Sequence, residues 1–390
     1  MRNDDCSNFG VYPAKMEKFI INIPAPAIED MKLRLGQTRW PFEIPGSGWR
    51  YGTDFTYLKA LCDYWKDTYD WRRQEEALNK FHHHKTRVEG FGLHYIYEKG
   101  KGKKNLPLLL IHGWPDSFYR FIKLIPLLTK PDANGIAFDV IVPSIPGFGF
   151  SDRPDRPGMN RVKIAALFHS LMTGALGYPK FFVQGGDWGG SIAQQLGLDF
   201  NDSIKAIHLS SIPSPIIFST DPALFNNEEL KYYQENKKWQ QTEGTFTLLQ
   251  STKPQTLAYE LNDSPSGLAG WYIEKFRNWS DSNGNPEERF TKDELLTNLC
   301  IYWFTQTAGS AERLYYEGIR QAPIKPGQIV MVPTYISVFP KDLLQMPESF
   351  ARRFFNVQRW HKMDAGGHFA AWEVPQLLAG EIRQSFGSIG

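Results

Sequence analysis

Apolar positions in the first quarter of the chain change their spacing near residue 82. Residues 28–41 form a short amphipathic pattern that stops at Pro41, and residues 55–81 repeat apolar side chains every three or four positions. Both patterns predict helices. Residues 84–100 alternate instead, with a turn signal near Gly90, which is typical of a β-hairpin. The chain is therefore expected to begin with helices and then to change to strands.

Short apolar runs that end in a turn recur through the middle of the chain, with helical segments between them. They occupy residues 106–112, 138–149, 181–190 and 205–211. Alternating strands and helices predict an α/β class protein with a mostly parallel sheet flanked by helices. In such a sheet the functional residues follow the carboxyl ends of the strands.

A long helical stretch, rich in aromatic residues, interrupts this alternation before strand character returns at residues 328–339 and 358–368. We therefore expect an α/β core divided by a helical cap, with an N-terminal extension outside it. The predicted segments are a flexible tail at 1–15, an N-terminal extension wrapping the core at 16–95, the first part of the core at 96–212, the cap at 213–325 and the second part of the core at 326–390.

Asp187 stands in the sequence VQGGDWGG, at the predicted turn from a strand into a helix. Glycines two positions before and after it allow the sharp turn that presents a nucleophile in α/β-hydrolases, where the residue is often serine. A carboxylate is already ionised at neutral pH and needs no activating base. Attack on a carbonyl would give an unstable anhydride, whereas attack on a saturated carbon gives a hydrolysable ester. Opening of an epoxide or displacement of a halide is thus favoured. The simpler alternative is an aspartate that caps the helix.

The sequence HGWPDS, at residues 112–117, follows the preceding predicted strand. In this architecture the loop supplies one main-chain N–H to an oxyanion hole, and the residue after the nucleophile supplies the other. The expected donors are the N–H groups of Trp114 and Trp188. A plain turn held by Gly113 and Pro115 explains the shape of the loop but not its pairing with a nucleophile turn.

His368 lies in the glycine-rich segment DAGGHFAAWE after the last predicted strand, where this fold places its base. The acid that orients it is expected after the preceding strand, and Asp342 stands there, with Glu348 as a weaker alternative. The consecutive histidines 82–84 are not expected to form a metal site, because three adjacent side chains cannot all face one ion in regular structure. Since the chain supplies nucleophile, base and oxyanion donors, neither a metal nor a cofactor is expected.

The bulk composition narrows the range of partners. The 44 Lys and Arg residues nearly balance the 42 Asp and Glu residues, so no strong field attracts nucleic acid or an anionic membrane. Aromatic residues make up 14% of the chain, which suits an apolar pocket. The three cysteines form no disulfide or zinc pattern, the start does not resemble a signal peptide, and no apolar run reaches about 18 residues. A soluble, cytoplasmic protein with a small uncharged substrate is expected.

Several longer motifs resemble those of epoxide hydrolases of the microsomal and juvenile-hormone type, and together they extend over most of the chain. They are TRWP (38–41) and YDWR (69–72) of an N-terminal meander, HGWPDS, IPGFGFSDRP (145–154), QGGDWGG, TKPQT (252–256), LNDSPSGLAGWYIEKF (261–276) and GGHFAAWE (366–373). The resemblance implies an α/β-hydrolase fold and hydrolysis of an apolar epoxide to a vicinal diol. It implies that Asp187 attacks the less hindered epoxide carbon. It also implies that Trp114 and Trp188 stabilise the oxyanion of ester hydrolysis, and that His368, oriented by Asp342, activates water.

The same resemblance implies two cap tyrosines that donate to the epoxide oxygen. SAERLYYEG (310–318) places Tyr315 in this role, with Tyr316 as a packing neighbour. At the position of the other tyrosine the chain has Phe246, which cannot donate a hydrogen bond. Either Tyr315 acts alone, or the electrophile differs, or another cap tyrosine compensates. The candidates for compensation are Tyr232, Tyr233 and Tyr259.

The pocket is expected between cap and core, with Phe246, Trp114 and Phe369 in its wall.

Two other functions compete with epoxide hydrolysis as interpretations of these motifs. A haloalkane-type dehalogenase would share the Asp–His–acid set and use the Trp188 indole for the halide, but the Tyr315 motif counts against it. A non-catalytic ligand-binding relative would have no use for nucleophile, base and acid together. A homodimer is a further expectation from the resemblance.

Overall fold

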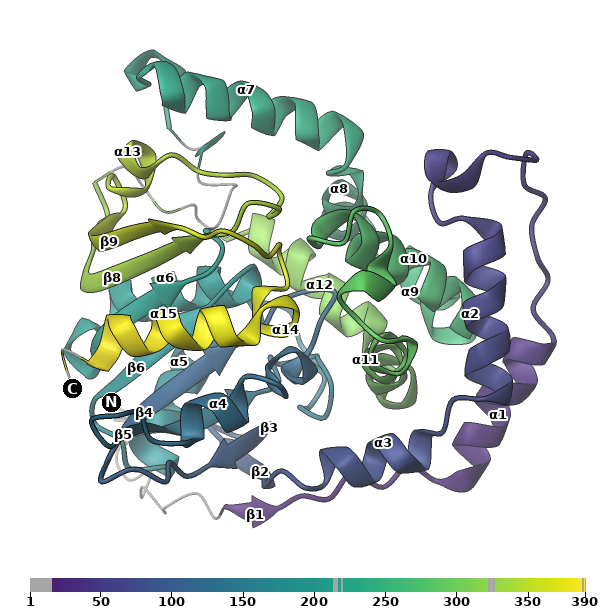
Figure 1. Ribbon diagram of the computed structural model, residues 1–390, viewed down its shortest axis with the longest axis horizontal. Helices are drawn as coiled ribbons and strands as arrows, with labels where there is room; N and C mark the ends of the chain where they lie inside the picture. The colour runs from purple at the N-terminus through teal and green to yellow at the C-terminus, as the bar shows by residue number, and fades with distance from the viewer. Residues whose placement is uncertain are drawn as a thin grey trace, which may run out of the picture.

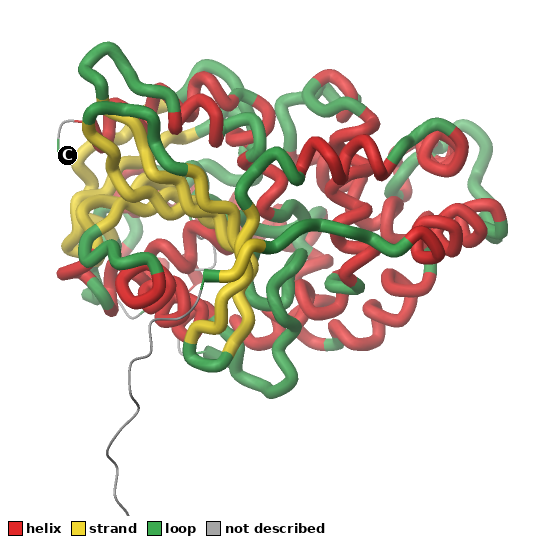
Figure 2. The backbone as a smooth tube through the Cα atoms, turned by 90° about the horizontal axis from the view of Figure 1, so that it is seen from below, coloured by secondary structure: helices red, strands yellow, loops and turns green. Residues whose placement is uncertain are grey.

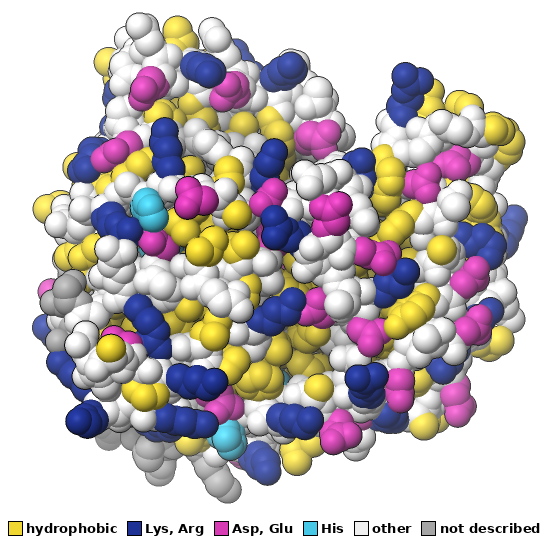
Figure 3. Space-filling view, viewed as in Figure 1, with side chains coloured by type: hydrophobic (Ala, Val, Ile, Leu, Met, Phe, Trp, Pro, Cys, Tyr) yellow, Lys and Arg dark blue, Asp and Glu magenta, His cyan; other side chains and the backbone are white. Residues whose placement is uncertain are grey.

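The structure is a computed structural model that describes residues 16–212, 217–218, 220–321, 324, 327–387 and 389. The flexible tail expected at residues 1–15 lies outside the described residues. Among the helices that are described, none is long and apolar enough to cross a membrane. On the face shown in Figure 3, Lys and Arg side chains intermingle with Asp and Glu, in keeping with the near balance of charge in the sequence.

A nine-stranded sheet forms the centre of the molecule, in the order β1-β2-β3-β5-β4-β6-β7-β8-β9 (Figure 1). Strands β4 to β9 are parallel to one another, and the β1–β3 meander joins them by an antiparallel pairing of β3 with β5. The mostly parallel sheet that the sequence predicts is thus confirmed. The strands are Glu17–Lys18, His83–Val88, Phe91–Glu98, Lys104–Ile111, Ile136–Pro143, Phe181–Gly185, Ile204–Leu209, Val330–Val338 and Phe355–Lys362.

Helices cover both faces of the sheet, because its central strands are apolar on both sides. Leu108, Leu109, Leu110 and Ile111 of β4 are all fully buried. Helices α4 (Ile125–Thr129) and α15 (Pro375–Gly387) pack together on one face, and α5 (Arg161–Ser170) and α6 (Trp188–Asp199) pack together on the other. The short helices α13 (Glu348–Ala351) and α14 (Ala370–Glu373) complete the carboxyl-terminal part.

Between β7 and β8 in the sequence, the described residues form six cap helices. They are α7 (Asn227–Thr242), α8 (Thr245–Thr252), α9 (Pro254–Asp263), α10 (Pro265–Trp279), α11 (Lys292–Thr305) and α12 (Ala308–Ile319). Figure 2 shows the strands gathered on one side of the molecule and most of these helices on the other.

The N-terminal helices α1 (Ala25–Gly36), α2 (Phe55–Asp67) and α3 (Trp71–Leu78) pack against the cap. The Trp65 indole donates to Cys300 Sγ (3.2 Å), and the hydroxyls of Tyr69 and Thr297 are 3.0 Å apart.

The helical pattern expected over residues 55–81 is broken between α2 and α3, where the side chain of Asp70 caps the second helix. The boundary expected at residue 95 falls within β3, which belongs to the central sheet.

Candidate active site

Asp187 occupies a strained turn between β6 and α6. Its backbone has φ 56° and ψ −129°, a conformation that side-chain-bearing residues rarely adopt. The glycines around it are required by close backbone contacts. A Cβ on Gly185 would lie 2.3 Å from the carbonyl oxygen of Gly189, and a Cβ on Gly189 would lie 2.0 Å from that of Ile111. The turn therefore places the Asp187 side chain at the carboxyl end of the sheet, where it points away from the surrounding main chain.

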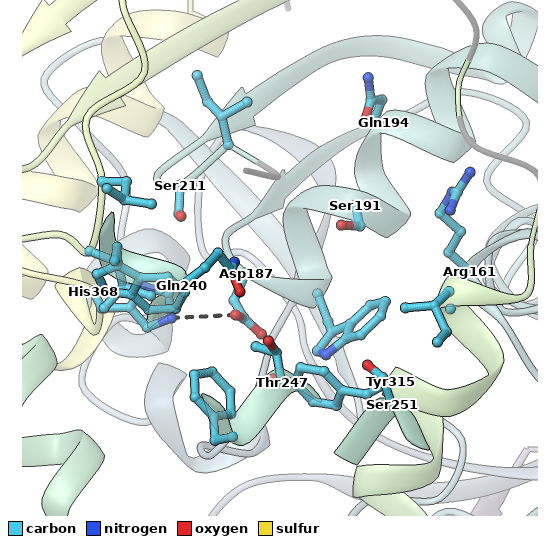
Figure 4. Close-up of a pocket in the computed structure, with 18 of the residues that line it drawn as sticks. Arg161, Asp187, Ser191, Gln194, Ser211, Gln240, Thr247, Ser251, Tyr315 and His368 are labelled. Atoms are coloured by element: carbon cyan, nitrogen blue, oxygen red, sulfur yellow. Dashed lines mark ion pairs between the residues drawn. The ribbon is translucent and has the colours of Figure 1, made fainter. Parts of the chain in front are cut away.

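The Asp187 carboxylate does not cap α6, which answers the simpler alternative considered for this residue. Its Oδ1 accepts a hydrogen bond of 2.9 Å from the main-chain N–H of Trp114, and its Oδ2 faces His368 Nε2 at 3.5 Å (Figure 4). Gly113 has no room for a side chain, since a Cβ there would lie 2.3 Å from Asp187 Oδ1. Trp188 is the first residue of α6, where main-chain N–H groups lack partners within the helix. Both expected oxyanion donors thus belong to segments that adjoin the carboxylate.

His368 is 4% exposed and lies between two carboxylates. Its Nδ1 is 2.7 Å from Asp342 Oδ1, and its Nε2 faces Asp187. Its main-chain N–H donates to the carbonyl of Trp279 (2.8 Å). Glu348, the alternative acid, instead pairs with Arg352 at 2.6 Å. The structure therefore brings Asp187, His368 and Asp342 together.

The carboxylates beside His368 control its charge. Burial alone lowers the pKa of the imidazole, but the negative charges of Asp342 and Asp187 outweigh this and raise the pKa from 6.5 to about 10. The ring is therefore protonated at neutral pH. A change that removes the charge of Asp187 therefore lowers the pKa of the ring.

A cavity of about 490 Å³ opens above these three residues, between α6 and the cap. Most of its wall is apolar, with polar side chains from α5 and α6 at one side. Besides the Asp187, His368 and Asp342 side chains, it is lined by Arg161, Trp188, Ser191, Gln194, Ser211, Ile212, Trp239, Gln240, Phe246, Thr247, Ser251, Tyr315, Gly318, Ile319, Gln321, Ile324, Leu343 and Leu344. The largely apolar wall suits a small organic substrate.

Tyr315 of α12 lies across the cavity from His368 (Figure 4). Its ring is edge-on to the Trp188 ring, with the ring centroids 5.0 Å apart. Burial, reinforced by the negative charge of Asp187, raises the pKa of its hydroxyl well above the ordinary value. The phenol therefore keeps its proton and can act as a hydrogen-bond donor. Phe246 of α8 stacks on Trp114 with the rings 5.2 Å apart and also lines the cavity.

Two of the three side chains expected in the pocket wall are elsewhere. Trp114 is fully buried behind Phe246, with its indole 3.3 Å from the hydroxyl of Tyr272. Phe369 is also fully buried and stacks on Phe276, with the rings 4.5 Å apart. Neither lines the cavity. For Phe369 the reason is the turn that leads into α14, in which His368 faces the site while Phe369 faces the core.

The other residues singled out in the sequence lie away from the cavity. Tyr232 is buried next to Phe350, Tyr233 packs beside Phe225, and Tyr259 is 71% exposed. None of these three tyrosines is among the described residues that line the cavity. The three consecutive histidines have different neighbours: His82 contacts Glu98, His83 contacts His94, and His84 stacks on Tyr95.

Several polar residues that line the cavity were not predicted from the sequence. Ser191 and Gln194 follow Asp187 by four and seven positions, which places them on the same side of α6. That helical spacing is a signal that could have found them. Arg161 has no such signal, because only the packing of α5 against α6 brings it to the cavity.

The chain matches two family models. Residues 16–121 match the epoxide hydrolase N terminus, and residues 107–375 match the alpha/beta hydrolase fold. Epoxide hydrolase 1 of Sus scrofa is 37% identical over 92% of this chain and 86% of its own length. Juvenile hormone epoxide hydrolase 1 of Ctenocephalides felis is 35% identical over 93% of this chain and 84% of its own.

A solved structure is also similar over nearly the whole length. Juvenile hormone epoxide hydrolase from the silkworm Bombyx mori superimposes with a TM-score of 0.84 at 29% sequence identity, covering 96% of this chain and 94% of that one. The similarity therefore includes the N-terminal meander and the cap as well as the central sheet.

Proposed function

This chain belongs to the epoxide hydrolase family and is an epoxide hydrolase, and we propose that it opens its substrate by forming an alkyl ester on Asp187. The observation that carries the proposal is the position of the Asp187 carboxylate. It is not used as a helix cap, it faces an apolar cavity, and it lies between the Trp114 N–H and the His368 ring.

In the first half-reaction, a carboxylate oxygen of Asp187 bonds to an epoxide carbon as the ring C–O bond breaks. The ring oxygen takes the proton of the Tyr315 hydroxyl, which lies at the same cavity. Esterification neutralises Asp187, so the pKa of His368 falls from its value of about 10. The imidazolium then returns a proton to the Tyr315 oxygen through solvent in the cavity and becomes a neutral base.

In the second half-reaction, neutral His368 takes a proton from water, and the oxygen of that water adds to the ester carbonyl carbon of Asp187. The negative charge that develops on the carbonyl oxygen is stabilised by the main-chain N–H groups of Trp114 and Trp188. The ester C–O bond then breaks, and the departing alkoxide takes the remaining proton of the new carboxyl group. Diol, ionised Asp187 and protonated His368 result, which is the starting state of the enzyme. Asp342 stabilises the charged ring through its contact with Nδ1.

We propose that Tyr315 alone protonates the ring oxygen, because it is the one phenol among the described residues that line the cavity. The substrate is proposed to be an apolar epoxide, in keeping with a wall formed by Trp, Phe, Ile and Leu side chains.

A cytoplasmic location and a homodimer are further proposals. Cys62 and Cys300 are buried free thiols, which supports a reducing compartment. Cell fractionation and light scattering test these two points.

The mechanism is tested with the purified protein and a panel of epoxides that includes styrene oxide and a long-chain aliphatic epoxide. We expect diol from the wild type and none from Asp187→Ala. We expect His368→Gln to accumulate a covalent adduct of epoxide mass on the intact protein. His82→Gln is the matched control, because His82 is an exposed histidine away from the cavity, and it should behave like the wild type.

Absence of both diol and adduct with every epoxide would overturn the Asp187 mechanism. The same samples would then be tested for halide release from haloalkanes. Diol formation by Asp187→Ala at the wild-type rate would assign the nucleophile to another group.

A further inference from the structure

A fully buried ion pair lies directly behind the oxyanion loop, and the chemistry described above does not use it. Asp116 is 0% exposed and Arg120, in the short 3-10 helix Phe118–Phe121, is 2% exposed. Asp116 Oδ2 and Arg120 Nη1 are 2.5 Å apart. Removing two charges from water costs several kcal/mol for each ion, and stability alone seldom requires such a pair.

Asp116 holds the loop that carries the first oxyanion donor. Its Oδ1 accepts a hydrogen bond of 2.9 Å from the N–H of Gly113, the residue before Trp114. Its main-chain oxygen accepts one of 2.5 Å from the hydroxyl of Tyr302 on α11. The loop is thus held on both sides in the position where the Trp114 N–H reaches Asp187.

Arg120 holds the loop that carries the base. Its Nη2 donates to the main-chain oxygen of His368 at 3.0 Å, across 248 positions of sequence. The planar guanidinium therefore spans two catalytic loops, with Asp116 on one side and the His368 backbone on the other. Asp187 and His368 are the other charged groups near Asp116, so the pair lies within the electrostatic environment of the reaction.

We propose that Arg120, paired with Asp116, is a positioning residue for ester hydrolysis. This inference rests on the proposed function. Hydrolysis needs water activated by His368 at the same carbon whose oxygen faces the Trp114 N–H, so the two loops must keep a fixed relation. Alkylation uses Asp187 and Tyr315 and does not require His368 as a base. Removing the contacts of Arg120 with Asp116 and with the His368 main chain should therefore slow ester hydrolysis more than alkylation.

The experiment measures both half-reactions of Arg120→Met in single turnovers. Samples mixed with styrene oxide are quenched in acid, and intact-mass analysis follows the alkyl-enzyme as it forms and decays. We expect the rate of ester decay to fall by about tenfold or more, while ester formation changes by less than about threefold. The ester should therefore accumulate in the variant.

Arg120→Met leaves Asp116 as an unpaired buried charge, which can unfold the protein. A second variant therefore removes both charges. Asp116→Asn with Arg120→Met removes both charges and keeps an oxygen to accept from Gly113 N–H. It should fold and show the same accumulation of ester. Arg120→Lys should recover part of the decay rate, because the ammonium reaches Asp116 but cannot span both loops as a fork.

Arg383→Met is the matched control. Arg383 also donates to main-chain oxygens, those of Leu127 (2.7 Å) and Lys130 (2.6 Å), but it lies on α15 away from the cavity. It should change stability without changing the ratio of the two rates. Equal slowing of both half-reactions in Arg120→Met and in the double variant, or no change in either of these two variants, would overturn the proposal while the wild type still forms diol. A wild type that forms neither diol nor adduct would overturn the proposed mechanism together with this inference.

Discussion

Phe246 stands where the resemblance to epoxide hydrolases implies a second cap tyrosine. Its ring lines the cavity beside Tyr315, with the centroids of the two rings 6.0 Å apart. Phe246→Tyr should add a second donor for the epoxide oxygen, and we expect alkylation to become about tenfold faster. Tyr315→Phe should slow alkylation by at least as large a factor, since it removes the phenol that remains. Single-turnover formation of the alkyl-enzyme measures both. An unchanged rate in Phe246→Tyr would show that its hydroxyl does not reach the ring oxygen.

The protonation of His368 gives a prediction about pH. A base acts when unprotonated, so ester hydrolysis should accelerate with rising pH and level off above the pKa of His368 in the alkyl-enzyme. In the free enzyme Asp342 and Asp187 hold this pKa at about 10. The ester carries no charge, so the kinetic pKa should lie below that value. Ester decay in rapid-quench experiments, compared with an NMR titration of His368 in the free enzyme, measures the difference. A kinetic pKa equal to that of the free enzyme would contradict the role given to the Asp187 charge.

At the scale of elements, the turn from β6 into α6 depends on how closely α6 approaches β4. Gly189→Ala would place a methyl group 2.0 Å from the backbone oxygen of Ile111, which no side-chain rotation can relieve. We expect a loss of about 3 kcal/mol in the free energy of unfolding and a larger loss of activity, since the turn carries Asp187. Gly380→Ala is the control: it lies inside α15 with open space at its Cβ, and it should stabilise by about 0.5–1 kcal/mol. Urea unfolding followed by circular dichroism compares the two, and similar effects would contradict the packing argument.

At the scale of the whole molecule, the N-terminal extension and the cap share one apolar interface. Trp65 of α2 is fully buried there and donates to Cys300 of α11. Trp65→Ala should lower the free energy of unfolding by about 3–5 kcal/mol through the cavity it leaves. Tyr259→Ala, a large aromatic residue of α9 that is 71% exposed, should change it by less than about 0.5 kcal/mol. Urea unfolding measures both, and a loss below about 1 kcal/mol in Trp65→Ala would show that the extension packs only loosely on the cap.

Much of the architecture was readable from the sequence because it depends on local spacing. Two-residue alternation and apolar runs located the strands, and three- and four-residue spacing located the helices of the extension. The turn at Asp187 was readable from its glycines, although only Gly185 is needed by the local backbone path, whereas Gly189 is needed by the close approach of α6 to β4. His368 was found from its place after the last strand. Their catalytic roles remain predictions that the variants above test.

Only the tertiary structure decided which side chains share the site. In the folded chain Phe369 is buried in the core, Trp114 stacks behind Phe246, and Arg161 lines the cavity. Arg120 also donates to the backbone of His368. Each of these contacts links segments that are far apart in the chain or depends on the direction of a side chain in an irregular loop. Periodicity carries no information about either, because it reports the conformation of a segment and not what packs against it. The sequence by itself determined the elements and the order of the reactive groups, and packing between distant elements decided how those groups are held and what surrounds them.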